Sequence, residues 1–261
     1  GYAVVLKNKN YLFVDGRYTI QAQIESGKNF EIVNFEKIFN CKLFKNLTIG
    51  IDPKVFTSNQ IKKFFRKSNR IKIISENLID QLTKPKTDNN KQFFSLPDNI
   101  SGMSYKRKIS NLIKLLKKNS AQYIFISAPE NVAWLLNIRG HDNPNSPIPN
   151  CKILLDTKKN IFFLSEKNKV GKLINEKKVK KKNIIHPKSF EKFIDSLKGK
   201  KVMLDVKTCS IYYEKIFKKK LKVIRTEDPI YLLKSIKNKT EINNMINAHI
   251  IDGVALTKFL F

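Results

Sequence analysis

Short runs of β-type residues alternate with helical segments along this chain, and that alternation limits the folds it can adopt. YAVVL and YLFV flank the polar turn KNKN, so residues 2–14 are expected to form a hairpin, followed by a helix from about Tyr18. NLTIGID reads as a strand, DPKVFTSNQIKKFF as a helix, and residues 71–74 as a further strand. Strand–helix alternation of this kind predicts an α/β domain with a mixed sheet.

A second α/β unit is expected after KPKTDNNKQFFSLPDNIS, a polar stretch whose two prolines predict a linker over residues 85–101. KISNLIKLLKK has the periodicity of an amphipathic helix and YIFIS that of a buried strand. SAPENVAWLL predicts a helix with Ser127 as the N-cap residue and Glu130 completing a capping box. ILLD and IFFLS predict a second hairpin, and VMLDV and LKVIR predict two strands around a short helix.

These patterns give a first domain at residues 1–84, a second domain at 102–227, and a separate C-terminal segment at 228–261. The last segment contains a long helix, for which Thr240 is the expected N-cap residue. Deleting residues 232–261 is expected to leave the melting temperature of the rest unchanged. The apolar stripe of the helix comprises Ile242, Met245, Ile246, His249, Gly253 and Leu256. The chain also begins without Met, and we expect it to be a piece of a longer protein, cut at both ends.

The formal net charge of +29 raises the possibility of nucleic-acid binding. Only six of the 51 basic residues are Arg, however, and Arg is the side chain that suits bidentate contacts to phosphates and bases. The lysines are scattered beside Asn and Ile, as in KKVKKKNII, a pattern that AT-rich codons produce. We therefore expect solvated lysines and no specific nucleic-acid site. No apolar run approaches the roughly 18–20 residues of a membrane span, so no membrane partner is expected.

Cysteine and histidine are sparse, which argues against a metal site. Cys41, Cys151 and Cys209 are far apart and are expected to be reduced and half-buried. The histidines are equally scattered and are expected at the surface or in packing contacts: His141, His186 and His249.

Residues 130–147, ENVAWLLNIRGHDNPNSP, hold the only Trp, one of the arginines, and a loop rich in Asn, Asp and Pro. The stretch resembles a segment in the middle domain of Xaa-Pro aminopeptidases, the three-domain form of the aminopeptidase P family. Ser146 separates Asn145 from Pro147, where the family has Asn and Pro adjacent, so the shape of this loop can differ. The matching residues are Glu130, Val132, Ala133, Trp134, Leu135, Asn137, Arg139, Gly140 and Asp142.

Other landmarks of the same family follow in order along the whole chain. FVDGRYTIQA, residues 13–22, is similar to the signature of its first domain, and GID at 50–52 and ENLID at 76–80 match later positions. LLKSIKN followed by AHIIDGVAL is similar to the entry into its catalytic domain. The resemblance implies two creatinase N-terminal-like α/β domains with mixed sheets flanked by helices, plus the first helix of a pita-bread catalytic domain.

The resemblance also implies a function for the parent enzyme. Members release the N-terminal residue from peptides with proline in the second position, using two divalent metal ions, usually manganese. Their metal ligands lie downstream of the region matched here, so no catalytic residue, metal ligand or cofactor is expected in this chain, and it should be inactive. A cytoplasmic homodimer is expected, in which this portion contributes substrate gating and subunit contacts.

Arg17 in DGRY is the candidate substrate-binding residue, because it matches a family position that contacts the bound peptide. A salt bridge to Asp15 is the alternative role. Trp134 is expected to anchor a helix against the middle sheet. Arg139 and Asp142 are expected to form a rigid corner in which the guanidinium satisfies carbonyls or a carboxylate, with a role at the cleft entrance or in a subunit contact as the alternative. The competing function for the whole chain is a stand-alone basic module that binds RNA or another anionic partner.

Overall fold

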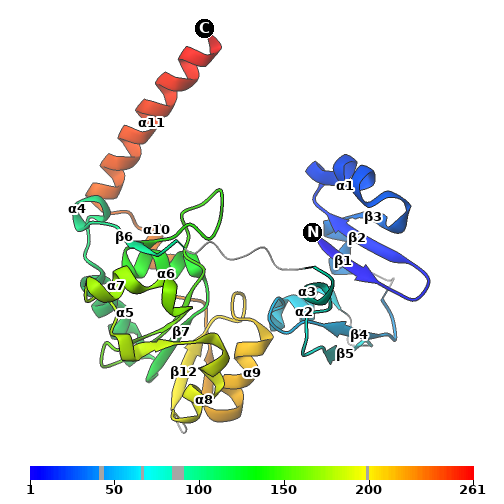
Figure 1. Ribbon diagram of the computed structural model, residues 1–261, viewed down its shortest axis with the longest axis horizontal. Helices are drawn as coiled ribbons and strands as arrows, with labels where there is room; N and C mark the ends of the chain where they lie inside the picture. The colour runs from blue at the N-terminus through cyan, green and yellow to red at the C-terminus, as the bar shows by residue number, and fades with distance from the viewer. Residues whose placement is uncertain (41–43, 66–67, 84–90, 198–199) are drawn as a thin grey trace. The chain divides into compact units, whose positions relative to one another are not determined.

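The computed structural model shows two compact units, Gly1–Leu78 and Ile79–Phe261 (Figure 1). Each unit contains helices and a sheet with both parallel and antiparallel strand pairs, so the predicted mixed α/β class is confirmed. The residues that the structure describes are 1–40, 44–65, 68–83, 91–197 and 200–261.

The first unit opens with the predicted hairpin. Strand β1 (Tyr2–Val5) pairs antiparallel with β2 (Asn10–Val14). Helix α1 (Thr19–Ser26) follows, and the chain then returns as β3 (Glu31–Asn34), parallel to β2. Shorter helical elements in this part of the chain are η1 (Gly16–Tyr18), η2 (Gly27–Asn29), η3 (Phe35–Asn40) and α3 (Leu78–Leu82).

A second parallel pair completes this unit. Strands β4 (Thr48–Ile51) and β5 (Arg70–Ile73) are connected through α2 (Ser58–Phe64). Helix α2 begins after Thr57, which forms a capping box with Gln60. The core of the unit is mainly aromatic, because rings from several of these elements meet in its centre. Its buried members are Tyr11, Phe13, Ile38, Phe44 and Phe64.

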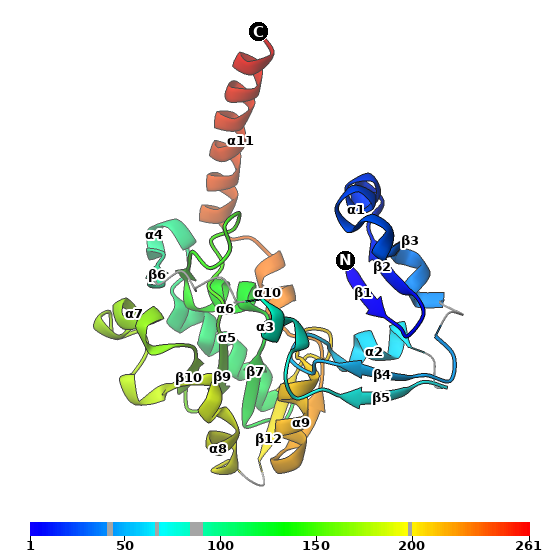
Figure 2. The same cartoon turned by 45° about the vertical axis from the view of Figure 1, so that its right-hand side comes forward.

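The second unit is built on a six-stranded sheet, and Figure 2 shows β10 (Ile161–Leu164), β9 (Lys152–Asp156), β7 (Tyr123–Ile126) and β12 (Lys201–Leu204) in succession. The predicted second hairpin is confirmed, because β9 and β10 pair antiparallel. The five strands other than β9 run parallel to one another. In spatial order the strands are β11 (Ile184–Ile185), β10, β9, β7, β12 and β13 (Lys222–Arg225).

Helices cover both faces of this sheet. Residues of α5, α6, α7 and α10 share one apolar cluster with Ile153 and Leu155 of β9, whereas residues of α8 and α9 share another with Leu154. Successive β9 side chains therefore point to opposite faces, as a doubly covered strand requires. The helices are α5 (Tyr105–Lys118), α6 (Pro129–Leu136), α7 (Gly171–Asn175), α8 (Phe190–Asp195), α9 (Ile211–Lys220) and α10 (Ile230–Ser235), with the turns η4 (Lys167–Lys169), η5 (Lys181–Asn183) and η6 (Pro187–Ser189).

The predicted linker differs from the structure in its described part. Residues 91–101 contain β6 (Phe94–Ser95) and α4 (Asp98–Ser101), and β6 pairs with β8 (Ile138–Arg139). Phe93 is completely buried, and its backbone N–H donates to the carbonyl of Lys169 at 2.8 Å. The polar composition of the segment predicts a linker, whereas its few apolar residues pack against residues that are far away in the sequence. Residues 85–90 of the predicted linker lie outside the described residues.

Two helix caps were predicted wrongly. Ala128, not Ser127, is the N-cap residue of α6, and the Ser127 hydroxyl lies 2.8 Å from that of Thr208. The last helix, α11 (Lys239–Leu260), is capped by Asn238 in a capping box with Glu241, two residues before the predicted Thr240. At α6 no side chain caps the helix, because the Ser127 hydroxyl lies against Thr208 instead. At α11 both Asn238 and Thr240 are polar residues that could serve as the cap, and the structure shows that Asn238 does.

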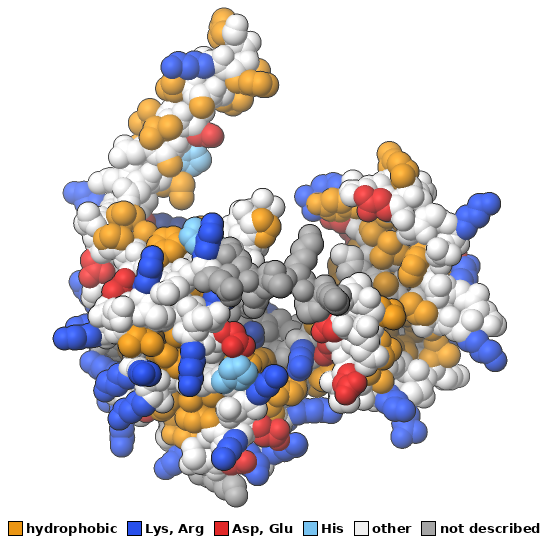
Figure 3. All heavy atoms as spheres, viewed as in Figure 1, with side chains coloured by type: hydrophobic (Ala, Val, Ile, Leu, Met, Phe, Trp, Pro, Cys, Tyr) orange, Lys and Arg blue, Asp and Glu red, His pale blue; other side chains and the backbone are white. Residues whose placement is uncertain are grey.

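The segment from residue 228 also packs more closely onto the second unit than predicted. Ile230 is completely buried, and the Asp228 backbone N–H donates to the carboxylate of Asp205 at 3.0 Å. Helix α10 therefore belongs to the core of this unit rather than to a separate segment. Helix α11 contains no buried residue, and Figure 3 shows hydrophobic side chains exposed along it.

Candidate functional site

Arg17 lies in the turn η1 that joins β2 to α1, with its side chain 79% exposed. The Asp15 carboxylate accepts hydrogen bonds from the backbone N–H of Arg17 at 3.0 Å and from Nε at 2.9 Å. These bonds hold the pKa of Asp15 below its ordinary value. The alternative salt bridge is thus present. It fixes the direction of the guanidinium, while Nη1 has no partner among the described residues.

A shallow groove of about 400 Å³ lies beside this turn, between β2 and α1. Tyr18, next to Arg17, forms part of its wall, and its ring lies 5.7 Å from the Arg17 guanidinium. Gln21 and Ala22, from the same DGRYTIQA stretch, also line it. The arrangement can therefore present a fixed cation next to a partly apolar surface, as recognition of a peptide group requires.

The corner expected around Arg139 is present. Its Nη1 donates to the carbonyls of Ile138 at 2.9 Å and Ala133 at 3.5 Å, so the guanidinium ties the end of α6 to β8. A Cβ on Gly140 would lie 2.7 Å from Cα of Pro149, which leaves room only for glycine. These contacts favour a structural role for the corner.

Asp142 does not pair with Arg139. Its carboxylate accepts from Nζ of Lys169 at 2.6 Å and from the backbone N–H of Asn150 at 2.7 Å. The Lys169 and Asp142 side chains are only 5% and 10% exposed. Sequence reasoning missed Lys169, because it sits in the lysine-rich stretch EKNKVGK, where no local signal separates a buried lysine from a solvated one.

Lys108 was also missed. It lies on the buried face of α5, where its Nζ donates to the Trp134 carbonyl at 3.0 Å and to Asn137 Oδ1 at 2.7 Å. The ammonium also lies 4.1 Å from the centre of the Trp134 ring, and burial lowers the pKa of Lys108 to about 8. Asn137 has left-handed backbone (φ 49°), and its Nδ2 donates to Ser101 Oγ and to the carbonyl of Met103.

This polar network is the floor of a groove of about 350 Å³ at the foot of α11. Trp134 and Arg139 form one wall, and Glu241 and Met245 of α11 are part of the other. Two hydrogen bonds attach α11 at this point, from Asn238 Nδ2 to the Ser101 carbonyl at 2.9 Å and from Asn244 Nδ2 to the Ile100 carbonyl at 3.1 Å.

In the part of the chain that the structure describes, no three His, Cys, Asp or Glu side chains converge as metal ligands would. Cys151 and Cys209 are fully buried rather than half-buried, and burial raises the pKa of both thiols. Cys41 lies outside the described residues. His141 packs face to face on Phe94, with ring centres 5.3 Å apart.

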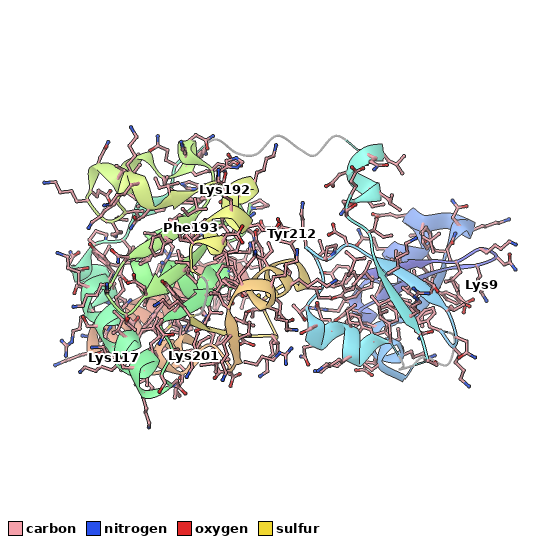
Figure 4. All side chains as sticks on the ribbon, turned by 90° about the horizontal axis from the view of Figure 1, so that it is seen from below. Lys9, Lys117, Lys192, Phe193, Lys201 and Tyr212 are labelled. Atoms are coloured by element: carbon pink, nitrogen blue, oxygen red, sulfur yellow. The ribbon has the colours of Figure 1, made fainter. Side chains whose placement is uncertain are left out.

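The lysines are distributed over many elements. Lys117 on α5, Lys192 on α8 and Lys201 on β12 belong to different elements, and Figure 4 shows Lys192 far from the other two. Among the helices in the described ranges, none combines the length and apolar character that crossing a membrane requires.

Comparison with known proteins places these features in context. Residues 83–241 match the model of the creatinase/prolidase N-terminal domain. The chain is 31% identical over 287 residues to Xaa-Pro aminopeptidase 1 of Dictyostelium discoideum, an alignment that covers 100% of this chain and 45% of that protein. It is 28% identical to a probable Xaa-Pro aminopeptidase P of Laccaria bicolor, covering 99% of this chain and 43% of that protein.

The fold has a solved counterpart. X-prolyl aminopeptidase from Caenorhabditis elegans, described as a cytosolic enzyme with a di-nuclear active site, superposes with a TM-score of 0.83 at 22% identity. The superposition covers 99% of this chain and 45% of that one. The chain thus spans less than half the length of the relatives it matches.

Proposed function

This chain belongs to the creatinase/prolidase N-terminal domain family, and from that membership we propose that it is the non-catalytic N-terminal portion of a Xaa-Pro aminopeptidase. The observation that carries the proposal is the 31% identity to Xaa-Pro aminopeptidase 1 over the full length of this chain. The parent enzyme would release the N-terminal residue from peptides with proline second. It would use two divalent metal ions, manganese by family resemblance, held by residues outside this sequence.

Within the parent enzyme, Arg17 is proposed to contact the peptide substrate. Its bonds to Asp15 support this role, because they hold a planar and permanently charged group in one direction beside the groove at Tyr18. Subunit contacts within a cytoplasmic homodimer are proposed as the second contribution of this portion. The alternative of an RNA-binding module receives no support from the relatives that the chain matches, which are aminopeptidases.

The reading frame downstream of codon 261 tests the proposal directly. We expect it to encode, in order, two Asp, one His and two Glu at the ligand positions of the pita-bread domain. A stop codon shortly after Phe261 would contradict the proposal and favour a stand-alone module.

The role of Arg17 is tested in the protein expressed from that longer reading frame. Replacing Arg17 with Gln should raise KM for a Xaa-Pro peptide about ten-fold with a smaller effect on kcat, because a charge-assisted contact to the substrate is lost. Arg107→Gln, which removes an exposed arginine of α5, is the matched control and should leave both constants unchanged. If KM and kcat are the same for the two variants, Arg17 does not contact the substrate and serves only in its salt bridge with Asp15.

A further inference from the structure

A pocket of about 180 Å³ lies at one edge of the six-stranded sheet in the second unit. At this edge β10 ends, β11 ends, and the antiparallel strand β9 begins, so Ser165, Pro187 and Lys152 line the same space. In open α/β sheets, ligands bind beyond the carboxyl ends of the parallel strands. The pocket therefore occupies the position at which this architecture forms binding sites.

The Asn- and Pro-rich loop that follows Gly140 forms another wall of this pocket. Asp142 lies near its start and Asn150 near its end, and both line the pocket. The Asp142–Lys169 ion pair and the backbone bond from Asn150 to Asp142 hold the loop in place. The loop is thus a fixed wall of a cavity, which gives its unusual composition a role beyond a turn.

Lys152 is the unusual residue of the pocket. It begins β9 and shares a sheet face with Leu154, which is buried against α8 and α9, so an apolar side chain is expected at this position. Its ammonium lies 5.5 Å from the centre of the Tyr213 ring, and no described residue accepts a hydrogen bond from it. Burial lowers the pKa of Lys152. A half-buried cation without an acceptor favours the entry of an anion.

The other charged side chains that line the pocket have partners within the protein. Lys169 bonds to Asp142, and Glu166 lies 3.2 Å from His186. Ser165 and Tyr213 also line the pocket, and neither hydroxyl has a hydrogen-bond partner among the described residues. One unpaired cation and two hydroxyl donors therefore surround the space.

We propose that this pocket binds a small carboxylate, whose charge is met by Lys152 and whose oxygens accept hydrogen bonds from Ser165 and Tyr213. One free cation balances a singly charged carboxylate, whereas a phosphate dianion would keep one unbalanced negative charge near the carboxylates of Asp142 and Glu166. The volume limits the ligand to a small organic acid, below the roughly 300 Å³ at which larger ligand pockets begin. The site is separate from the proposed contact of Arg17 with peptide.

Propionate is the probe, and thermal unfolding and saturation-transfer NMR on residues 1–261 are the measurements. Propionate should raise the melting temperature saturably at constant ionic strength, because a ligand that binds only the native state stabilises it by mass action. Neutral propionamide, which has nearly the same shape, should have no such effect. Inorganic phosphate should act more weakly than propionate.

The Lys152→Met variant should fold, because Met keeps the apolar stem and removes a half-buried charge, and it should weaken propionate binding about ten-fold or more. Tyr213→Phe should weaken it by about three-fold. Lys158→Met, which removes an exposed lysine from the turn at the other end of the β9–β10 hairpin, should bind as the wild type does. Undiminished binding by folded Lys152→Met, or equal effects of propionamide and propionate, would overturn the proposal. Tighter binding of phosphate would overturn the carboxylate assignment.

Discussion

At the scale of the residue, Asn137 combines two roles that two substitutions can separate. Its backbone is left-handed at the end of α6, and its side chain bonds to Lys108, Ser101 and the Met103 carbonyl. Asn137→Gly keeps the backbone conformation but leaves the buried partners of the side chain without hydrogen bonds. It should lower the free energy of unfolding by about 2–3 kcal/mol. Asn137→Ala should lower the free energy of unfolding by roughly 1 kcal/mol more, because left-handed backbone is unfavourable for alanine. Urea unfolding of both variants measures the difference, and equal losses would show that the backbone is unstrained.

Lys108 should make stability depend on pH. Its pKa is about 8 in the folded protein against 10.5 when unperturbed, so the unfolded state binds more protons between these values. The free energy of unfolding contributed by Lys108 should therefore increase as the pH rises from about 8 to about 10.5, by up to about 3 kcal/mol. In Lys108→Met this contribution is absent. Urea unfolding at several pH values measures the free energy of unfolding of both proteins. Between about pH 8 and about pH 10.5 this free energy should increase more in the wild type than in Lys108→Met. An equal pH dependence of the two proteins would contradict the lowered pKa.

At the scale of the element, the hydrogen bonds between α11 and the rest of the described residues lie at its first turns. The bonds from Asn238 to Ser101 and from Asn244 to Ile100 hold it, whereas Ile250, Phe259 and other apolar residues further along are exposed. Apolar surface contributes about 25 cal/mol per Å², so several such side chains favour association by several kcal/mol. Deleting residues 250–261 should therefore leave the melting temperature unchanged and reduce self-association, as measured by thermal unfolding and light scattering.

A longer deletion should behave differently. Removing residues 232–261 would also remove Lys234, whose Nζ donates to the completely buried Asn131 at 2.6 Å, and the Asn238 contact. We expect this variant to melt several degrees lower, because a buried polar group loses its partner. The sequence alone predicts no change for this deletion, since it places the domain boundary before α10. An unchanged melting temperature would restore that boundary.

At the scale of the whole molecule, the charge of +29 should produce only weak binding to nucleic acids. The lysines are spread over both units, so affinity should come from counterion release and should fall steeply as salt rises from about 50 to about 200 mM. Fluorescence anisotropy with unrelated DNA and RNA oligonucleotides of equal length measures this. A sequence-selective complex that persists at the higher salt would contradict the expectation and revive the binding-module alternative.

Residues 1–261 by themselves should show no aminopeptidase activity. The described residues contain no converging set of metal ligands, and metal-assisted hydrolysis needs such a set. The measurement is a fluorogenic Xaa-Pro assay after dialysis against manganese, with metal analysis of the same sample. Turnover that stays with the protein through purification and scales with its concentration would contradict this expectation.

The sequence by itself determined the family and the elements with strong periodicity. Strands such as 123–126 and helices such as 105–118 follow from apolar periodicity, which depends only on residues a few positions apart. The DGRY turn was also readable, because Asp15 and Arg17 are near neighbours and their contact is local. The family resemblance rests on motifs in order along the chain, and the match of residues 83–241 to the creatinase/prolidase N-terminal domain confirms it.

Only the tertiary structure decided which polar side chains lie inside. Lys108, Lys152 and Lys169 look like any other lysine of this basic sequence, yet all three lie in polar clusters of the second unit. Phe93, within a predicted linker, is completely buried against partners that lie far away in the sequence. Lys169 and Asp142 are 27 residues apart, and they meet only because the sheet brings their loops to one edge. Burial and pairing depend on contacts between distant segments, and no short window of sequence contains both partners.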